Sequence, residues 1–454
     1  MDGNLSRRRI ASTREILPRR LGILTVCLLV NMLIGCRRSP PEPATVQYTY
    51  SWNEDRPKTR AVFRQFKQET GIRVKNIPVP EYTRQYVDLA LKLLKNGSGP
   101  DVLNIDLIWS PILESNLVDL RPYLAAEIPQ LDPQLLTIYT VNGKLVAVPF
   151  NVPLGGLEYR VDLLRKYGYD HPPGTWGELE SMAARIQAGE RARGIKDFWG
   201  YVWQGAAGEA LTCNALEWQA AEGGGRIIER DRTISVNNPA AIRSWQRAKR
   251  WIGWISPPSV VAYRELDSEP VFDSGKAAFS RIWILTPMTK SGQARQIGWR
   301  SFRPSVVPTA FSRMPAGAAG SAGALGGTGT AVSLRSAHLM EAVALLRFQL
   351  RALMLANEKD SASAFHLQAG LLDRPSIMNS HGVPASNQLA SMVARPYIEA
   401  GTSYKQVSQA YIDTVHAVLT GHKAAPAAAA ELEKQLMEIT GFSAGPPRTD
   451  QTVR

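Results

Sequence analysis

Aromatic, amide and acidic side chains follow predicted strands near the start of this chain. Trp52, Asn53 and Glu54 come after a strand predicted over 46–50, and Asp106 lies at the end of a strand predicted over 101–107. Aromatic rings pack on apolar surfaces, and carboxylates accept charge-assisted hydrogen bonds. These residue types suit non-covalent binding of a polar ligand, and they need no covalent step.

Motifs for other chemistry are missing from the sequence. The six histidines (His171, His338, His366, His381, His416 and His422) lack metal-ligand spacing, and no Gly-x-Ser-x-Gly elbow occurs. The glycine-rich stretch 315–330 lacks the Gly-Lys-Ser/Thr of a phosphate loop. Cys213 is predicted to be a buried small apolar residue. We therefore predict no catalytic residue, no metal and no cofactor, and the scattered charges resemble no nucleic-acid groove.

The elements that position the first residues alternate in type. Helices are predicted over 57–69 and up to Lys95, between strands over 46–50, 72–79 and 101–107. This order predicts a parallel sheet with right-handed crossovers. Ligands of such sheets bind beyond the carboxyl ends of the strands, where Glu54 and Asp106 are expected.

Later segments carry clear helix boundaries. Thr175-Trp-Gly-Glu178 is a capping box, and Asn238-Pro239 is an N-cap followed by proline. Gly441 is expected to end a late helix, and residues 442–454 are expected to be a disordered tail. Further predicted elements are a strand over 145–150, helices over 161–167, 208–221 and 336–356, and a loop over 315–330 that leads into a strand.

The N-terminus has the pattern of an export signal. Six arginines precede the uncharged 14-residue run Leu21–Ile34, which is short for a permanent membrane helix of about 20 residues. The run ends in Leu33-Ile34-Gly35-Cys36, which resembles a bacterial lipobox. We expect a signal peptide over 1–35, lipid on Cys36 and a proline-rich tether over 36–44. An uncleaved anchor helix is the alternative, and both export the rest of the chain.

Several segments, in this order and spacing, resemble one family. The chain is similar to the family 1 extracellular solute-binding proteins, the lipoproteins of carbohydrate ABC transporters of the trehalose/maltose-binding type. The matching segments are 99–109 (GPDVLNIDLIW), 143–149 (GKLVAVP), 198–205 (FWGYVWQG), 272–283 (FDSGKAAFSRIW), 325–327 (LGG) and 415–421 (VHAVLTG).

This resemblance implies an α/β fold of the periplasmic-binding-protein-like type II, with two lobes, a hinge and a ligand cleft between them. Lobe 1 is expected over 45–149 plus about 303–355, and lobe 2 over 150–302 plus about 356–441. The implied partners are a carbohydrate, the permease subunits with their cytoplasmic ATPase, and the membrane through lipidated Cys36. The protein is expected to be a monomer.

The resemblance also implies ligand-binding residues. Asp106 is expected to accept hydrogen bonds from sugar hydroxyls, and Trp283 is expected to stack on a sugar face beside Arg281. Glu54 is expected to face the cleft from the first strand–helix loop. The remaining residues assigned to the ligand are Asn151, Gln204, Glu209, Gly327 and Arg374.

Two departures from the family pattern affect the ligand. Relatives have Tyr-x-Asp-Ala-Gly where this chain has Asn151-Val-Pro153-Leu-Gly155, and Gly-Gly-Trp where it has Gly326-Gly327-Thr328. Loss of a charged hydrogen bond costs about 1.5–3 kcal/mol, so trehalose or maltose is not assumed. Asn151, Glu158 or a ligand of different shape would compensate. The net charge of +13 leaves an acidic or phosphorylated sugar open.

Two other functions remain as alternatives. A secreted carbohydrate-active enzyme would need two carboxylates about 5–5.5 or 6.5–9.5 Å apart, which Asp106 and Glu209 would have to supply. A sugar sensor that passes its liganded state to a membrane signalling receptor would share every feature of the binding protein.

Overall fold

The computed structural model of the chain describes residues 44–49, 57–80, 83–95, 99–131, 133–284, 307–359 and 392–448. Residues from Thr45 onward form one compact unit, which is described here by itself. Three residues assigned from the sequence, Cys36, Glu54 and Arg374, lie outside the described ranges. Within those ranges no helix has both the length and the apolar character needed to cross a membrane.

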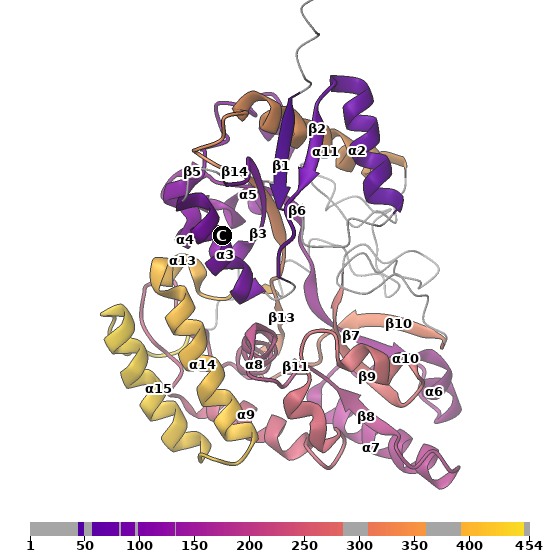
Figure 1. Ribbon diagram of the computed structural model, residues 1–454. Helices are drawn as coiled ribbons and strands as arrows, with labels where there is room; N and C mark the ends of the chain where they lie inside the picture. Colours follow the sequence, from indigo (N-terminus) through magenta and orange to yellow (C-terminus); the bar gives the residue numbers. More distant parts are fainter. Residues whose placement is uncertain are drawn as a thin grey trace, which may run out of the picture. The chain divides into compact units, whose positions relative to one another are not determined.

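The first sheet begins with the alternation predicted from the sequence. Its elements are β1 (Thr45–Thr49), α2 (Pro57–Thr70), β2 (Arg73–Asn76), α3 (Thr83–Lys95) and β3 (Val102–Asp106). β1 pairs in parallel with both β2 and β3. These three strands lie side by side in Figure 1. The parallel arrangement is therefore confirmed, and β3 ends at Asp106.

Two further strands complete this sheet in the order β2-β1-β3-β14-β6, and β14 runs antiparallel to both of its neighbours. β14 (Thr328–Val332) pairs with β3 on one side and with β6 (Val148–Asn151) on the other. Thr328 is the register partner of both Asp106 and Asn151. Between β3 and β6 the chain forms η1 (Leu107–Trp109), α4 (Ser110–Leu113), η2 (Glu114–Asn116), η3 (Ile128–Gln130), α5 (Pro133–Ile138), β4 (Thr140–Val141) and β5 (Lys144–Leu145).

A second sheet has the order β10-β7-β9-β8. β7 (Leu154–Arg160) pairs antiparallel with β9 (Ala277–Ile284) and β10 (Thr309–Arg313), and β8 (Trp199–Val202) pairs in parallel with β9. The expected return to lobe 1 near residue 303 is therefore wrong, because β10 still belongs to this sheet. Its partner strand lies about 150 residues earlier, and nothing local in the sequence indicates that pairing.

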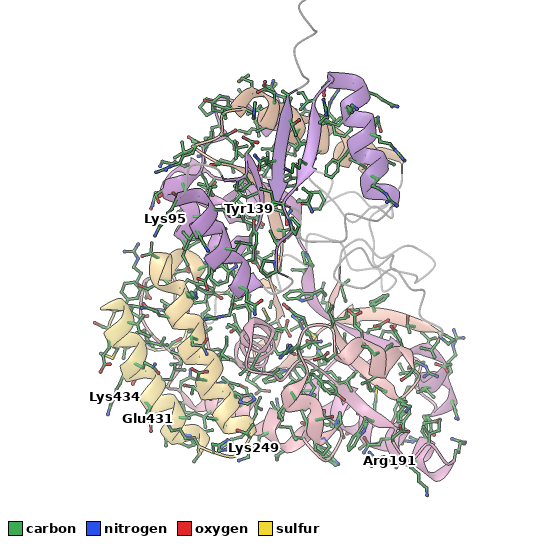
Figure 2. The ribbon with its side chains drawn as sticks, in the orientation of Figure 1. Lys95, Tyr139, Arg191, Lys249, Glu431 and Lys434 are labelled. Carbon is green, nitrogen blue, oxygen red and sulfur yellow. The ribbon has the colours of Figure 1, made fainter. Side chains whose placement is uncertain are left out.

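Helices surround the second sheet. The elements before β9 are α6 (Val161–Lys166), α7 (Trp176–Ala192), α8 (Glu209–Ala221), α9 (Pro239–Trp251), η4 (Pro258–Ala262) and α10 (Ser268–Asp273). Near the C-terminus, α14 (Tyr404–Leu419) and α15 (Ala425–Thr440) pack on α9, as Figure 1 shows, and α14 also packs on α8. In consequence every side chain of α8 is buried. Figure 2 shows Glu431 and Lys434 on the outer side of α15.

Tryptophans build much of the core beneath this sheet. Trp176, Trp203, Trp218 and Trp251 are all nearly inaccessible, and their rings pack against one another at centroid distances of 5.0–6.4 Å. Aromatic side chains bury a large apolar area, which stabilises the fold. The tryptophan content therefore serves packing more than ligand stacking, and Trp109 is likewise buried, against Tyr404.

Helix boundaries follow the capping signals. Thr175 and Glu178 form the reciprocal capping box of α7, and the Asn238 side chain accepts from Ala240 N and Ala241 N of α9. Gly441 adopts the left-handed conformation that ends α15. All three predicted boundaries are confirmed.

The stretch 315–330 contains more structure than the predicted loop. It forms the short strands β11 (Ala316–Gly317), β12 (Gly320–Ser321) and β13 (Gly323–Ala324) before β14. β13 pairs in parallel with β15 (Met392–Val393). The remaining described elements are α11 (Leu339–Lys359), α13 (Tyr397–Ala400) and η6 (Gly401–Ser403).

The expected disordered tail is wrong for residues 442–448. Ile234 N donates to Ser443 O, and Gly445 N donates to Ile234 O, each at 2.9 Å. Arg448 also forms an ion pair with Asp231 at 2.7 Å. These bonds satisfy backbone groups that would otherwise bind water, and they hold the segment on the fold. The composition of the segment resembles that of a loop, so the sequence did not indicate this contact.

Candidate ligand-binding site

Asp106 lies at the carboxyl end of β3, as predicted. Its side chain accepts from Ile108 N at 3.2 Å and thereby caps η1, and it stays 14% exposed. Leu107 N donates to Gly327 O, so the turn before β14 lies beside the same strand end. The two predicted residues Asp106 and Gly327 are thus close neighbours.

Arg395 connects this strand end with the second half of the molecule. The residue follows β15, and its side chain is only 3% exposed. One guanidinium nitrogen, Nη2, lies 3.4 Å from Asp106 Oδ1 and 3.5 Å from Leu325 O, and Nη1 donates to Glu209 Oε1 at 3.1 Å. Burial opposes its charge, but the neighbouring ionisable groups, Asp106 and Glu209 among them, raise the pKa of Arg395. Its Nε has no hydrogen-bond partner among the described residues.

Glu209 occupies the first turn of α8, where a helix favours negative charge. Besides Arg395, Tyr404 donates to its Oε1 at 2.5 Å and Ser408 to its Oε2 at 2.6 Å. Tyr404 and Ser408 are one turn apart on α14 and so share a face. Arg84 on α3 adds an ion pair at 3.8 Å. Since both oxygens of Glu209 are engaged, this residue holds Arg395 in place.

Arg281 and Glu217 form a second arginine–glutamate pair. Arg281 donates from Nε to Glu217 Oε2 at 3.2 Å and from Nη2 to Oε1 at 2.6 Å, and both side chains are at most 1% exposed. Ala324 N adds a third hydrogen bond to Oε1 at 3.0 Å. A Cβ on Gly155 would lie 1.8 Å from that oxygen, so the neighbouring strand must carry glycine there. Arg281 is therefore placed in a closed internal pair.

Trp283 follows Arg281 on β9 and is partly exposed. The Arg281 guanidinium lies 4.0 Å from its ring centroid, and a Cβ on Gly326 would lie 2.8 Å from the ring. A cation therefore covers the indole, which also rests against the turn that leads to Gly327.

Gln204 is buried among protein groups. Its amide nitrogen donates to Ser268 Oγ at 2.7 Å and to Arg281 O at 3.0 Å, and its oxygen accepts from Asn214 at 3.1 Å. With these bonds Gln204 fixes the start of α10 against β9. Its role in this geometry is to anchor the loop before α10.

That loop carries Glu265, which the sequence analysis missed. Glu265 is partly exposed and has no hydrogen bond or ion pair with the described residues. Burial, followed by the nearby Asp106 carboxylate, raises its pKa to about 7, and Glu209 acts in the same direction. Arg395 and Arg281 oppose the shift. Glu265 therefore lies within electrostatic reach of both arginine–glutamate pairs.

The other assigned residues have different outcomes. Asn151 lies in β6 opposite Thr328, and only its backbone is described. Glu158 is inaccessible in β7. Ligand binding by each of these residues, and by Glu54 and Arg374, stays a prediction.

The missed residues are Glu265, Arg395 and Tyr139. The Tyr139 hydroxyl is buried without a hydrogen-bond partner among the described residues, and burial, then Asp106, raises its pKa. Figure 2 labels this side chain within the part of the molecule that holds the first sheet. No local pattern marks Glu265 or Tyr139. Arg395 has one local signal, because Arg395-Pro396 lies one residue after the short strand β15.

Comparison with known proteins identifies the class. Residues 51–352 match the model of the bacterial extracellular solute-binding protein family. A probable ABC transporter-binding protein of Deinococcus radiodurans is 36% identical over 381 residues, covering 82% of this chain and 88% of the relative. The chain therefore belongs to the bacterial extracellular solute-binding proteins.

More distant similarities agree. A putative ABC transporter periplasmic-binding protein of Escherichia coli K12, YcjN, is 25% identical over an alignment that covers 64% of this chain and 65% of YcjN. The maltose-bound MalE3 structure of T. maritima is 27% identical, with a TM-score of 0.74, and covers 87% of this chain and all of that one. A Listeria monocytogenes protein in complex with cycloalternan shares the fold at 17% identity and a TM-score of 0.69, covering 88% of this chain and all of that one. The fold is the two-lobed α/β fold of type II periplasmic binding proteins.

Proposed function

We propose that this protein is the substrate-binding component of a carbohydrate ABC importer. It captures a saccharide or polyol without changing it chemically and presents it to the permease. The observation that carries the proposal is the charged cluster of Asp106, Glu209, Glu265 and Arg395. It joins the carboxyl end of β3 to α8 in a member of the solute-binding family.

The chemistry of the cluster suits hydroxyl groups. Carboxylates accept hydrogen bonds from hydroxyls, and a guanidinium donates to them, with the strength of charge-assisted bonds. The partly exposed Trp283 adds an apolar surface for the C–H face of a sugar ring. Relatives of known structure include one bound to maltose, which supports the ligand class.

The arrangement in the cell follows from the N-terminal pattern. The basic segment, the apolar run and Cys36 support export and a lipid anchor. The two sheets support one lobe around β2-β1-β3-β14-β6 and another around β10-β7-β9-β8, with a hinge between them. The pairing of β10 with β7 supports a return to the first lobe between Arg313 and Thr328.

Glycoside hydrolysis is the less favoured function. Both oxygens of Glu209 accept hydrogen bonds from Arg395, Tyr404 and Ser408. A general acid must give a proton to the glycosidic oxygen, and a carboxylate without a free oxygen is poorly placed for that transfer. Glu209 therefore suits the positioning of Arg395 better than catalysis.

A ligand screen tests the proposal. Purified protein without its first 36 residues is mixed with monosaccharides, oligosaccharides and polyols, and its melting temperature is measured. We expect at least one saccharide to raise the melting temperature and to bind by calorimetry, with no release of reducing ends. If every saccharide fails while another solute class binds, the carbohydrate assignment is wrong.

A further inference from the structure

Two polar groups of the cluster lack partners among the described residues. The carboxyl of Glu265 makes no hydrogen bond or ion pair there, and Nε of Arg395 is buried without an acceptor. A buried donor without an acceptor costs free energy, so a group like Arg395 Nε is rare unless water or a ligand binds it. One is an acceptor and the other a donor. The loop of Glu265 lies against the segment before α8, because Ala206 N donates to Tyr263 O at 3.0 Å, and Glu209 at the start of α8 binds Arg395.

The backbone holds Glu265 in position. Arg264 N donates to Asp267 Oδ2 at 2.8 Å, and Asp267 N donates back to Arg264 O at 3.2 Å, which closes a turn around the residue. Gln204 holds the residue that follows this turn, because its side chain donates to Ser268 at the start of α10. The carboxyl group is thus carried by an anchored loop, and among the described residues it has no hydrogen-bond partner.

A structural glutamate in this protein looks different. Glu217 is fully buried and accepts three hydrogen bonds, two from Arg281 and one from Ala324 N. Glu265 has none, and the charge of Asp106 and Glu209 adds repulsion. Its shifted pKa of about 7 agrees with a carboxyl that is short of donors.

We propose that Glu265 and Arg395 are the acceptor and donor of one subsite, which binds neutral saccharide hydroxyls and rejects acidic saccharides. A hydroxyl is suited to this pair because it can donate to Glu265 and accept from Arg395 Nε. A ligand carboxylate can only accept and would face Glu265 and Asp106. This inference rests on the proposed function and narrows its substrate class.

The acidic groups around Arg395 have the opposite sign to the net charge of the whole chain. The whole chain has a formal charge of +13, which alone would favour anionic ligands. Within the cluster, Arg395 is already paired with Asp106 and Glu209, and Glu265 adds a further acid. Like charges placed together disfavour an anionic partner, so selection against acidic sugars follows.

Matched pairs of neutral and acidic probes test the inference. The pairs are glucose and gluconate, maltose and maltobionate, cellobiose and cellobionate, mannitol and mannonate, and ribitol and ribonate. Wild type and E265Q are titrated with each pair by calorimetry at pH 8, after circular dichroism and melting establish that the variant is folded. The control is E438Q, the same change at an exposed position of α15.

For wild type, we expect the neutral member of at least one pair to bind about tenfold or more tightly than its acid. E265Q should lower the affinity for the neutral member about ten- to a hundred-fold and so reduce the difference in affinity between the neutral and acidic members. The control E438Q should match wild type. Equal binding of neutral probes by wild type and E265Q, or tighter binding of the acids, overturns the inference and leaves carbohydrate binding intact. Binding of no probe by wild type overturns the proposed function and this inference with it.

Discussion

Helix α8 carries two glutamates, two turns apart, that each pair with an arginine in a different environment. Glu217 and Arg281 are closed off from solvent, and every oxygen of the carboxylate has a donor. Glu209 and Arg395 are also buried, but Arg395 keeps an unpartnered Nε and borders the partly exposed Asp106 and Glu265. The carboxylate of the first pair is satisfied within the protein, whereas the second pair keeps one donor, Arg395 Nε, without an acceptor among the described residues.

This difference shows that residue type alone does not identify a binding arginine. Arg281 matches a family motif for ligand contact, yet its Nε and Nη2 both bind Glu217 and its guanidinium lies over Trp283. Arg395 matched no pattern used in the sequence analysis, yet it lies at the junction of two parts of the fold. What distinguishes the two is the buried Nε of Arg395, which lacks an acceptor among the described residues, whereas Nε of Arg281 binds Glu217.

The largest loss of stability is expected from a substitution that breaks the buried pair of Arg281 and Glu217. Glu217→Gln leaves the Arg281 charge buried without a counterion, which typically costs about 3–5 kcal/mol of unfolding free energy. Urea denaturation followed by tryptophan fluorescence measures this loss. A change below about 1 kcal/mol would mean that Glu217 and Arg281 are not the internal pair described here.

A smaller effect on stability is expected at Glu265, where a substitution should raise the unfolding free energy. Its folded pKa of about 7 lies above the ordinary carboxyl value, so the folded state binds the proton more tightly than the unfolded chain. The resulting penalty grows as pH rises from about 4.5 to 7 and is complete above 7. E265Q should therefore raise the unfolding free energy at pH 8, by ~2 kcal/mol at most because the side chain keeps some solvent contact, and leave it unchanged near pH 4.5.

The same ionisation should appear in ligand affinity. Hydroxyl donors favour the charged carboxylate, so saccharide binding lowers the pKa of Glu265 and affinity falls as the pH drops through 7. The surrounding charged groups are Asp106, Glu209, Arg281 and Arg395. Calorimetry of wild type should show about tenfold weaker binding at pH 5.5 than at pH 8. An equally steep profile in E265Q would assign the titration to another group.

The smallest effect is expected at an exposed pair. Lys423 and Glu431 form an ion pair on the outer side of α15, and both side chains are about half exposed. Such surface pairs contribute about 0–1 kcal/mol. Glu431→Gln should therefore change the unfolding free energy by less than about 1 kcal/mol in the assay used for Glu217→Gln. A larger loss would show that the assay does not separate buried from exposed pairs.

Local signals predicted much of the fold. The capping residues Thr175 and Asn238 and the terminating Gly441 act within a few residues of themselves, so the sequence is enough to place them. The burial of Cys213 was also predicted, and that burial raises the pKa of its thiol to about 12. Long-range pairing was not predictable: β10 joins the second sheet, and Ser443 and Gly445 bind Ile234, without a local mark.

The site was predicted in part for the same reason. Asp106 was found because it ends a strand, and Glu209 because it opens a helix within a family motif. Arg395 and Glu265 act through residues more than one hundred positions away, so only the folded chain brings them together.

The most direct test of the account is a calorimetric titration of wild type and Asp106→Asn with a neutral saccharide found in the ligand screen. Asparagine keeps the oxygen that caps η1 and removes the charge that faces Arg395. We predict that affinity falls about tenfold or more while the melting temperature of the unliganded protein changes little. Equal affinity in the two proteins would contradict the claim that this cluster binds the ligand.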